Sequence, residues 1–211
     1  MATRESHLVS IYQLKPAFQN LLRPIVGKLA EAGVTANAVT IAAALLSLLV
    51  GACIAAWPAA AWPLLMLPVF LFLRMALNAI DGMLAREHDQ QSRAGTLLNE
   101  LGDVVSDAAL YLPLALVAGF DPGLVVTVVV LAIIGEMTGV LGPQVGASRR
   151  YDGPMGKSDR AFVFGALALW VGLSGPVDPG LTWILAAMAL LSAWTVFNRA
   201  RAALAEGDHD G

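Results

Sequence analysis

The stretch NAVTIAAALLSLLVGACIAAW, residues 37–57, decides the class of fold, because it contains no charged residue. A helix that crosses a bilayer needs roughly 20 mostly apolar residues. The whole chain has 211 residues, of which 57% are hydrophobic and 14% charged, whereas soluble domains are about a quarter charged. We therefore predict an all-α integral membrane protein with six transmembrane helices. The other predicted spans are residues 62–86, 96–119, 123–145, 160–174 and 178–198.

The placement of the basic residues predicts how these helices are oriented. Lys and Arg occur before the first span, between the second and third, between the fourth and fifth, and after the last. The connections near residues 58–62, 120–123 and 174–180 contain neither. Because cytoplasmic loops carry the excess of Lys and Arg, both termini are expected to face the cytoplasm.

The segment before the first span mixes apolar and basic side chains, and Pro16 and Pro24 interrupt it. This pattern predicts a broken amphipathic helix that either lies in the membrane interface or packs on the cytoplasmic side of the bundle. Thr35 or Asn37 is expected to cap the first span. The predicted regions are an amphipathic juxtamembrane segment over residues 1–36, a six-helix membrane domain over 37–200 and a polar C-terminal tail over 201–211.

Polar residues gather at the cytoplasmic ends of the second and third spans, where ionisable groups are costly and usually functional. Asn78 and Asp81 are three residues apart, and Asn99, Asp103 and Asp107 follow one another at intervals of four. Residues three and four apart share a helix face, so each helix is expected to present a stripe of oxygen atoms. Carboxylate and amide oxygens suit a hard divalent cation, which we expect to be Mg²⁺ or Mn²⁺.

The spacing of these residues resembles the signature of the CDP-alcohol phosphotransferases. That signature reads D-x-x-D-G-x-x-A-R, then eight residues, then G-x-x-x-D-x-x-x-D. The matching residues are Asn78, Asp81, Gly82, Ala85 and Arg86, followed after eight residues by Gly95, Asn99 and Asp103. Every spacing agrees, and only the two asparagines differ from the fixed residues. The six-span layout and the amphipathic segment extend the resemblance over nearly the whole chain, which is identified as a member of a bacterial inner-membrane branch.

The resemblance implies an enzyme of phospholipid synthesis that moves a phosphoalcohol group, typically phosphatidyl, from a CDP-linked donor such as CDP-diacylglycerol to an acceptor hydroxyl, releasing CMP. It implies that Asp81 binds metal and orients the nucleotide, and that Asp103 takes the acceptor's proton as general base. It also implies an active site on the cytoplasmic face, membrane lipid as partner, a homodimer and no nucleic-acid partner. The residues expected to line the CDP pocket are Asp81, Gly82, Ala85, Arg86 and Gly95.

The two asparagines change the metal chemistry that the resemblance implies. The expected ligands are Asn78, Asp81, Asn99 and Asp103, of which only two are charged. An Asn carbonyl oxygen is neutral, so a divalent ion tolerates it but binds it more weakly than a carboxylate. We therefore expect weaker binding, or one metal ion where four carboxylates would balance two.

Other acids could compensate for the missing carboxylates. Glu87, Glu100 and Asp107 lie close to the motif in sequence. Glu136, near the middle of the fourth span, has two interpretations. It forms a buried ion pair with Arg74 of the second span, or it replaces a metal ligand.

A basic cluster occupies the connection between the fourth and fifth spans. As part of a cytoplasmic loop, these residues simply satisfy the positive-inside rule. Alternatively they form an anion pocket beside the motif, because paired arginines suit phosphate. They resemble the acceptor sites of family members that use phosphorylated sugar alcohols, which favours a phosphorylated alcohol as acceptor. The cluster consists of Arg149, Arg150, Lys157 and Arg160.

A non-catalytic family member that binds nucleotide-lipid or scaffolds a membrane partner is the main alternative function. A decayed site would lose Arg86 and Asp103 as freely as the metal ligands, yet both are present. A small transporter would need polar residues through the depth of several spans, and here they lie mostly at one end. The sequence therefore favours the enzyme.

Overall fold

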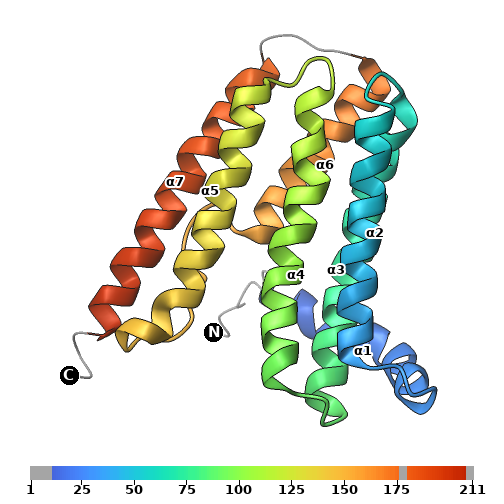
Figure 1. Cartoon of the computed structure of the whole chain (residues 1–211), viewed down its shortest axis with the longest axis vertical. Helices are drawn as coiled ribbons and strands as arrows, with labels where there is room; N and C mark the ends of the chain where they lie inside the picture. The colour runs from blue at the N-terminus through green and yellow to red at the C-terminus, as the bar shows by residue number, and fades with distance from the viewer. Residues whose placement is uncertain (1–10, 176–179, 208–211) are drawn as a thin grey trace, which may run out of the picture. The chain divides into compact units, whose positions relative to one another are not determined.

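The computed structural model describes residues 11–175 and 180–207, with the backbone alone over 11–16. Every regular element in these ranges is a helix (Figure 1). The elements in chain order are α1 (Ile11–Glu31), α2 (Ala36–Ala56), α3 (Ala61–Glu87), α4 (Arg93–Tyr111), the 3₁₀ helix η1 (Leu112–Leu116), α5 (Pro122–Leu141), the 3₁₀ helix η2 (Gly142–Val145), α6 (Lys157–Ser174) and α7 (Gly180–Gly207).

Four helical segments of the described chain are long and apolar enough to cross a membrane, and they are α2, α3, α5 with η2, and α7. Helices α4 and α6 have 19 and 18 residues and fall outside this set. The reason lies in their composition, because α4 carries the polar stripe of the motif and α6 begins with Lys157, Ser158, Asp159 and Arg160. Both of these predicted spans carry candidate site residues, and the apolar span α3 also does so.

Helix α7 is longer than the span predicted over 178–198. It continues to Gly207 and so includes the first residues of the predicted polar tail, while residues 208–211 lie outside the described residues. The cap of α2 is Thr35, whose hydroxyl accepts a hydrogen bond from the Ala38 N–H at 3.2 Å. Of the two candidate caps, the structure therefore selects Thr35.

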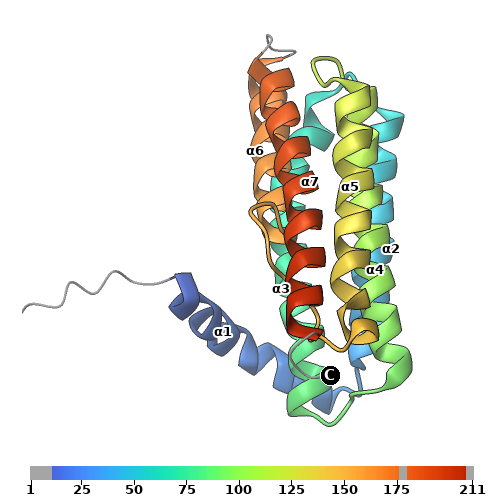
Figure 2. The ribbon, with the colours of Figure 1, turned by 90° about the vertical axis from the view of Figure 1, so that its left-hand side faces the viewer.

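The predicted break in the juxtamembrane segment is wrong, because α1 runs without interruption through both prolines, Pro16 and Pro24. Its Leu22 and Val26 are buried in one apolar cluster with residues of α3, and Figure 2 shows α1 lying across the C-terminal part of α3. On its other side Leu21 is 72% exposed. Helix α1 therefore packs on the protein with one face and leaves apolar side chains free on another.

The helices divide into two compact units. Of the described residues, unit 1 comprises those up to Ala43 together with Leu73–Glu100, and unit 2 comprises Ala44–Phe72 and those from Leu101 on. The buried apolar residues divide in the same way, which gives each unit a core of its own. The core of unit 1 consists of Leu22, Val26, Ala36, Val39, Ile80, Met83 and Leu84.

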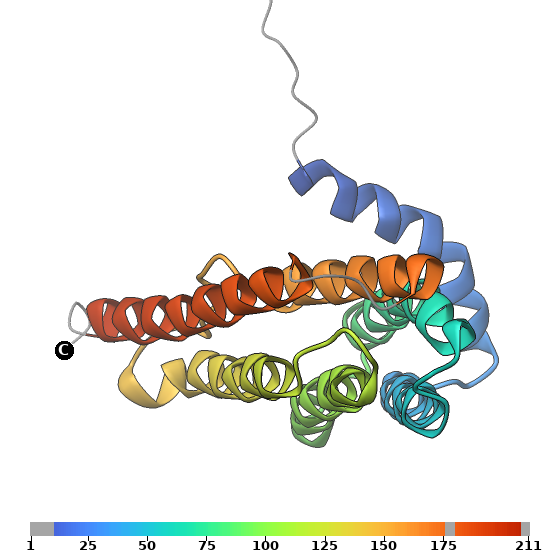
Figure 3. The same cartoon turned by 90° about the horizontal axis from the view of Figure 1, so that it is seen from above.

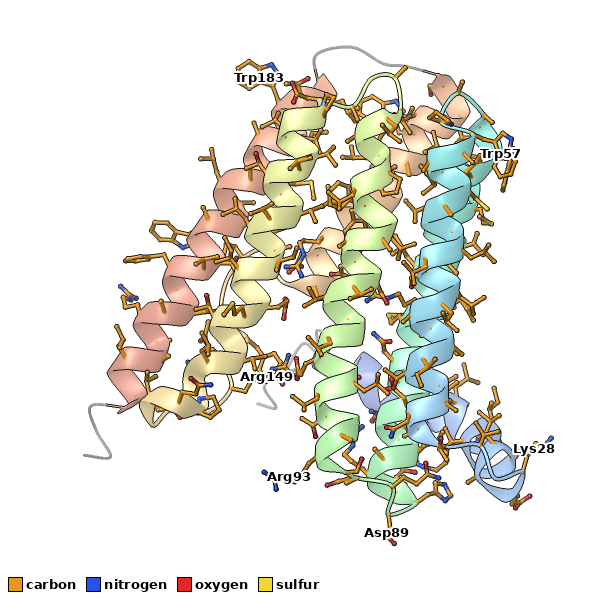
Figure 4. The ribbon with its side chains drawn as sticks, in the orientation of Figure 1. Lys28, Trp57, Asp89, Arg93, Arg149 and Trp183 are labelled. Carbon is orange, nitrogen blue, oxygen red and sulfur yellow. The ribbon has the colours of Figure 1, made fainter. Side chains whose placement is uncertain are left out.

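Unit 2 is built around α5 and α7, which lie side by side in two views (Figures 1 and 3). The ring of Tyr111 stacks on Phe164 of α6, with centroids 4.4 Å apart. Helices α2 and α4 touch where Gly51 lies against the carbonyl of Ala109, at a place that a Cβ would fill. Trp57 and Trp183 lie at one end of this unit and Arg149 lies toward the other (Figure 4). In membrane proteins Trp is enriched at both membrane–water interfaces, and Lys and Arg are enriched in cytoplasmic loops.

Candidate active site

The first half of the motif lies in the last turns of α3, within unit 1. Asp81 is buried, with 5% of its surface exposed, and the Thr40 hydroxyl donates a hydrogen bond to its Oδ2 at 2.9 Å. A buried carboxylate needs such donors to offset the loss of hydration. Thr40 belongs to α2, so the orientation of Asp81 is fixed from outside the motif, by a residue that the spacing did not identify.

The next residue, Gly82, leaves space for the guanidinium of Arg86, which lies one turn later on the helix. A Cβ at position 82 would lie 3.1 and 3.2 Å from the two terminal nitrogens of Arg86. The guanidinium therefore lies along the helix over the glycine, and Arg86 itself is exposed. In this position Arg86 presents several hydrogen-bond donors, and no side chain at position 82 blocks access to them. Such a group of donors suits a phosphate. Ala85, on the same helix, has only a methyl group as its side chain.

The second half of the motif begins where α4 starts. The Ser92 Oγ accepts a hydrogen bond from the Gly95 N–H at 2.9 Å. A Cβ at Gly95 would lie 2.8 Å from Asn37 Oδ1 of α2, so only glycine permits this approach. The Gln90 Oε1 accepts from the Ala36 N–H at 2.7 Å. The first turn of α2 is therefore tied to the α3–α4 connection, and Asn99 follows one turn after Gly95 on α4.

Asp103, in unit 2, is the predicted general base, and it forms an ion pair with Lys157, the first residue of α6. Helix α6 starts here because the Asp159 carboxylate accepts a hydrogen bond from the Gly156 N–H at 2.9 Å. Both members of the pair are partly exposed. The structure thus brings a predicted catalytic residue together with a predicted acceptor-binding residue.

Deeper in unit 2, Arg160 links two acids. Its Nη2 lies 3.0 Å from Glu136 Oε1 and 3.4 Å from Asp107 Oδ2, and its side chain is only 2% exposed. Arg199 of α7 adds a second cation, with its Nη1 at 3.4 Å from the same Glu136 oxygen. Because these charges compensate one another out of water, Glu136 is an ion-pair residue rather than a replacement metal ligand. The sequence did not predict that Arg160 and Arg199 are its partners in unit 2.

The neighbouring arginines differ in their contacts. Arg150 donates to both carboxylate oxygens of Asp152, at 2.8 and 2.9 Å, and also pairs with Glu206. This guanidinium holds the pKa of Asp152 below its usual value. Arg149 donates to the Tyr151 hydroxyl at 3.0 Å, and its Nη2 lies 4.0 Å from Glu136 Oε2.

Two of the acids that could compensate for the asparagines, Glu87 and Asp107, are engaged elsewhere. Glu87 accepts two hydrogen bonds from Arg23 of α1, at 3.0 and 3.1 Å, and Asp107 faces Arg160. Among the described residues, no group of three or more His, Cys, Asp or Glu side chains could hold a metal ion. A divalent ion at the motif would therefore depend on the amide oxygens of Asn78 and Asn99 as well as on carboxylates.

Comparisons with known proteins agree with the resemblance seen in the motif. A family model described as CDP-alcohol phosphatidyltransferase matches residues 33–197. The inner membrane protein YnbA of Escherichia coli K12 is 47% identical over 204 residues, which cover 93% of this chain and 97% of that protein.

Two crystal structures of a Mycobacterium tuberculosis enzyme, the phosphatidylinositol phosphate synthase PgsA1, have a similar fold. One has CDP-DAG bound and gives a TM-score of 0.73, with 85% of this chain and 92% of that chain covered. The other is in complex with manganese and citrate and gives a TM-score of 0.72, with 85% and 87% covered. At 20% identity, these matches concern the fold. The fold is therefore that of a multi-pass membrane protein.

Proposed function

Because this chain belongs to the CDP-alcohol phosphatidyltransferase family, we propose that it is a divalent-metal-dependent transferase of phospholipid synthesis. It transfers a phosphatidyl group from a CDP-linked donor such as CDP-diacylglycerol to an acceptor hydroxyl and releases CMP. One observation supports this activity more than any other. Asp103, the proposed base, is paired with Lys157, a proposed acceptor-binding cation, so an acceptor held by the lysine would arrive beside the base.

The donor is bound by the motif residues of α3 and the start of α4. Arg86 donates to the phosphate groups of the donor, Gly82 leaves room for its guanidinium, and Gly95 allows the close approach of Asn37 at the edge of the pocket. Asp81, oriented by Thr40, holds the metal and the cytidine nucleotide. The presence of CDP-DAG in a structure of PgsA1 is consistent with this assignment. The residues proposed to line the CDP pocket are Asp81, Gly82, Ala85, Arg86 and Gly95.

The metal ligands proposed are Asn78, Asp81, Asn99 and Asp103. All four offer oxygen atoms, which is the chemistry that Mg²⁺ and Mn²⁺ prefer, and two carboxylates balance one divalent ion. When bound, the ion supplies positive charge that stabilises the pyrophosphate and the departing CMP. Manganese is present in the second PgsA1 structure.

The transfer step needs a base, a nucleophile and a leaving group. Asp103 accepts the proton of the acceptor hydroxyl, and the acceptor oxygen attacks the phosphorus of the phosphatidyl group. The bond from that phosphorus to the bridging oxygen of the pyrophosphate breaks, and CMP leaves with the bonding electrons. Lys157 beside Asp103 keeps the acceptor and the base together.

The acceptor proposed is a phosphorylated alcohol, bound by Arg149, Arg150, Lys157 and Arg160. The side chains of Arg149 and Lys157 are 31% and 29% exposed, whereas that of Arg160 is 2% exposed. We assign direct contact with the acceptor phosphate to the two accessible groups. Arg150 and Arg160 already form ion pairs with carboxylates, so we assign them a supporting role.

The arrangement in the membrane follows from the same residues. We propose six transmembrane helices, with both termini and the active site at the cytoplasmic face of a bacterial inner membrane, and a homodimer. Helix α1 belongs to the juxtamembrane segment 1–36 and would dip its exposed Leu21 and Ile25 into the lipid interface. The membrane domain proposed is 37–200, followed by the tail 201–211.

CMP release by the purified protein in lipid tests the proposal. The assay contains CDP-diacylglycerol, Mg²⁺ or Mn²⁺, and a panel of alcohols and phosphoalcohols, with Asp103→Asn as the control. We expect release that depends on one acceptor and is lost in Asp103→Asn. The loss of two motif carboxylates to Asn78 and Asn99 favours one competing function, a protein that binds nucleotide-lipid without turnover. Binding of CDP-diacylglycerol with no CMP release from any mixture would establish that function instead.

A further inference from the structure

The connection between η2 and α6, which contains Arg149 and Arg150, is bonded to one face of α7. The Thr195 Oγ1 accepts a hydrogen bond from the Met155 N–H at 3.0 Å. One turn on, Arg199 Nε donates to the Asp152 carbonyl oxygen at 3.2 Å. Two turns further, Glu206 accepts from Ser148. These three residues of α7 therefore contact the connection near its end, its middle and its beginning.

Glu206 makes the largest number of these contacts. Its Oε1 accepts from the Ser148 N–H at 2.8 Å, and its Oε2 accepts from the Ser148 hydroxyl at 3.1 Å. The same Oε2 pairs with the guanidinium of Arg150. One carboxylate therefore holds the residue before Arg149 and the residue after it.

Close packing accompanies these bonds at both ends of the connection. A Cβ at Gly207 would collide with the carbonyl oxygen of Val145. Gly153 has a φ of +122°, and a Cβ there would lie 2.6 Å from Thr195 Cγ2. Side chains at either position would force the connection away from α7, so its path is set by α7.

We propose that Glu206 is a positioning residue for acceptor binding, because it holds Ser148 and Arg150 and thereby places the guanidinium of Arg149. This role rests on the proposed function, in which Arg149 contacts the acceptor phosphate. Arg150 shares its charge between Asp152 and Glu206, so its contribution is structural. Without Glu206 the backbone around Arg149 loses two anchors, and the arginine samples positions away from the acceptor.

Trypsin provides a first test that needs no substrate, since it cleaves after Arg149 and Arg150. Trypsin can cut here only when the connection opens locally. Weakening a charge-assisted hydrogen-bond network of this kind should raise the population of the open state roughly tenfold. Glu206→Gln keeps a side chain that can still bond Ser148 but loses the charge that holds Arg150. In lipid nanodiscs we expect Glu206→Gln to be cut at this site roughly tenfold faster than the wild type. The matched control is Glu31→Gln, at an exposed acid of α1.

Enzyme kinetics provides the second test. The acceptor KM should rise several-fold in Glu206→Gln while the KM for CDP-diacylglycerol stays unchanged, and Glu206→Asp should recover part of the loss. Equal cleavage in Glu206→Gln and wild type would overturn the anchoring of the connection. Faster cleavage with an unchanged acceptor KM would overturn the role in acceptor binding. Absence of CMP release by the wild type would instead remove the proposed function, and the acceptor role with it.

Discussion

The candidate residues of the two units differ in the contacts described above. In unit 1 neutral groups bond to the motif, with the Thr40 hydroxyl donating to Asp81 and Ser92 accepting from Gly95. In unit 2 the charged residues hold one another, since Lys157 pairs with Asp103 and Arg160 pairs with Glu136. A neutral donor leaves the negative charge of a carboxylate to attract a cation, whereas an ion pair compensates that charge before any ligand arrives.

The largest expected effect lies in unit 2, where the ion pairs of Arg160 are buried. Arg160→Leu removes the cation between Asp107 and Glu136 and leaves two carboxylates out of water. Breaking a buried pair from one side costs about 3–5 kcal/mol. For a chain of this size we expect the melting temperature in detergent to fall by roughly 10 °C.

Arg201→Leu, at an exposed position of the same basic type, is the control and should melt within a few degrees of the wild type. Removing one of the stranded acids as well should recover part of the loss, so Arg160→Leu with Asp107→Asn should melt above Arg160→Leu alone. If Arg160→Leu melts together with the control, ion pairs do not hold unit 2 and the contrast between the units disappears.

The same contrast explains which parts of the site were predictable. The motif on α3 and α4 was found because its residues are three or four apart, so helix geometry alone places them on one face. The cluster of Asp107, Glu136, Arg160 and Arg199 comes from four helices and depends on tertiary packing. Spacing along the chain does not indicate that these four residues meet, and it does not indicate that Glu206 meets Ser148 and Arg150 either.

The fold was predictable to a similar extent and for similar reasons. Apolar stretches predicted the positions of the six long helices after α1, and four of these helical segments are long and apolar enough to cross a membrane. The predicted break at Pro16 and Pro24 failed, because packing of Leu22 and Val26 on α3 stabilises one continuous helix despite the prolines. Local propensity is a weak guide where tertiary contacts compensate it.

A second prediction concerns the charge of unit 1. Restoring acids with Asn78→Asp and Asn99→Asp should tighten Mn²⁺ binding by roughly tenfold, about 1.4 kcal/mol, and should raise the number of ions bound from one to two. Calorimetric titration of the protein in detergent measures both. Asn20→Asp, at an exposed position of α1, is the control for added charge alone. Two tightly bound ions in the wild type at neutral pH would contradict the single-ion expectation.

A third prediction concerns the hydroxyl that orients Asp81. Thr40→Val has nearly the same shape but cannot donate, so the buried carboxylate loses a hydrogen bond worth about 1–3 kcal/mol. We expect a lower melting temperature and weaker Mn²⁺ binding. Thr40→Ser retains the donor and should stay closer to the wild type in both measurements. Equal behaviour of the valine and serine variants would mean that the hydroxyl does not orient Asp81.

The smallest expected effect belongs to Arg150 and Asp152, because this pair is partly exposed and surface ion pairs contribute little. Since the guanidinium lowers the pKa of Asp152 in the folded protein, the pair's contribution is complete above the unfolded pKa, about 3.9, and disappears as the pH falls through the folded value. The difference in melting temperature between wild type and Asp152→Asn should therefore be constant from pH 7 to 5 and shrink below about pH 4. A difference in melting temperature that stays constant down to pH 3 would show that Asp152 stabilises the protein through packing and not through its charge. Only the buried ion pairs would then stabilise unit 2.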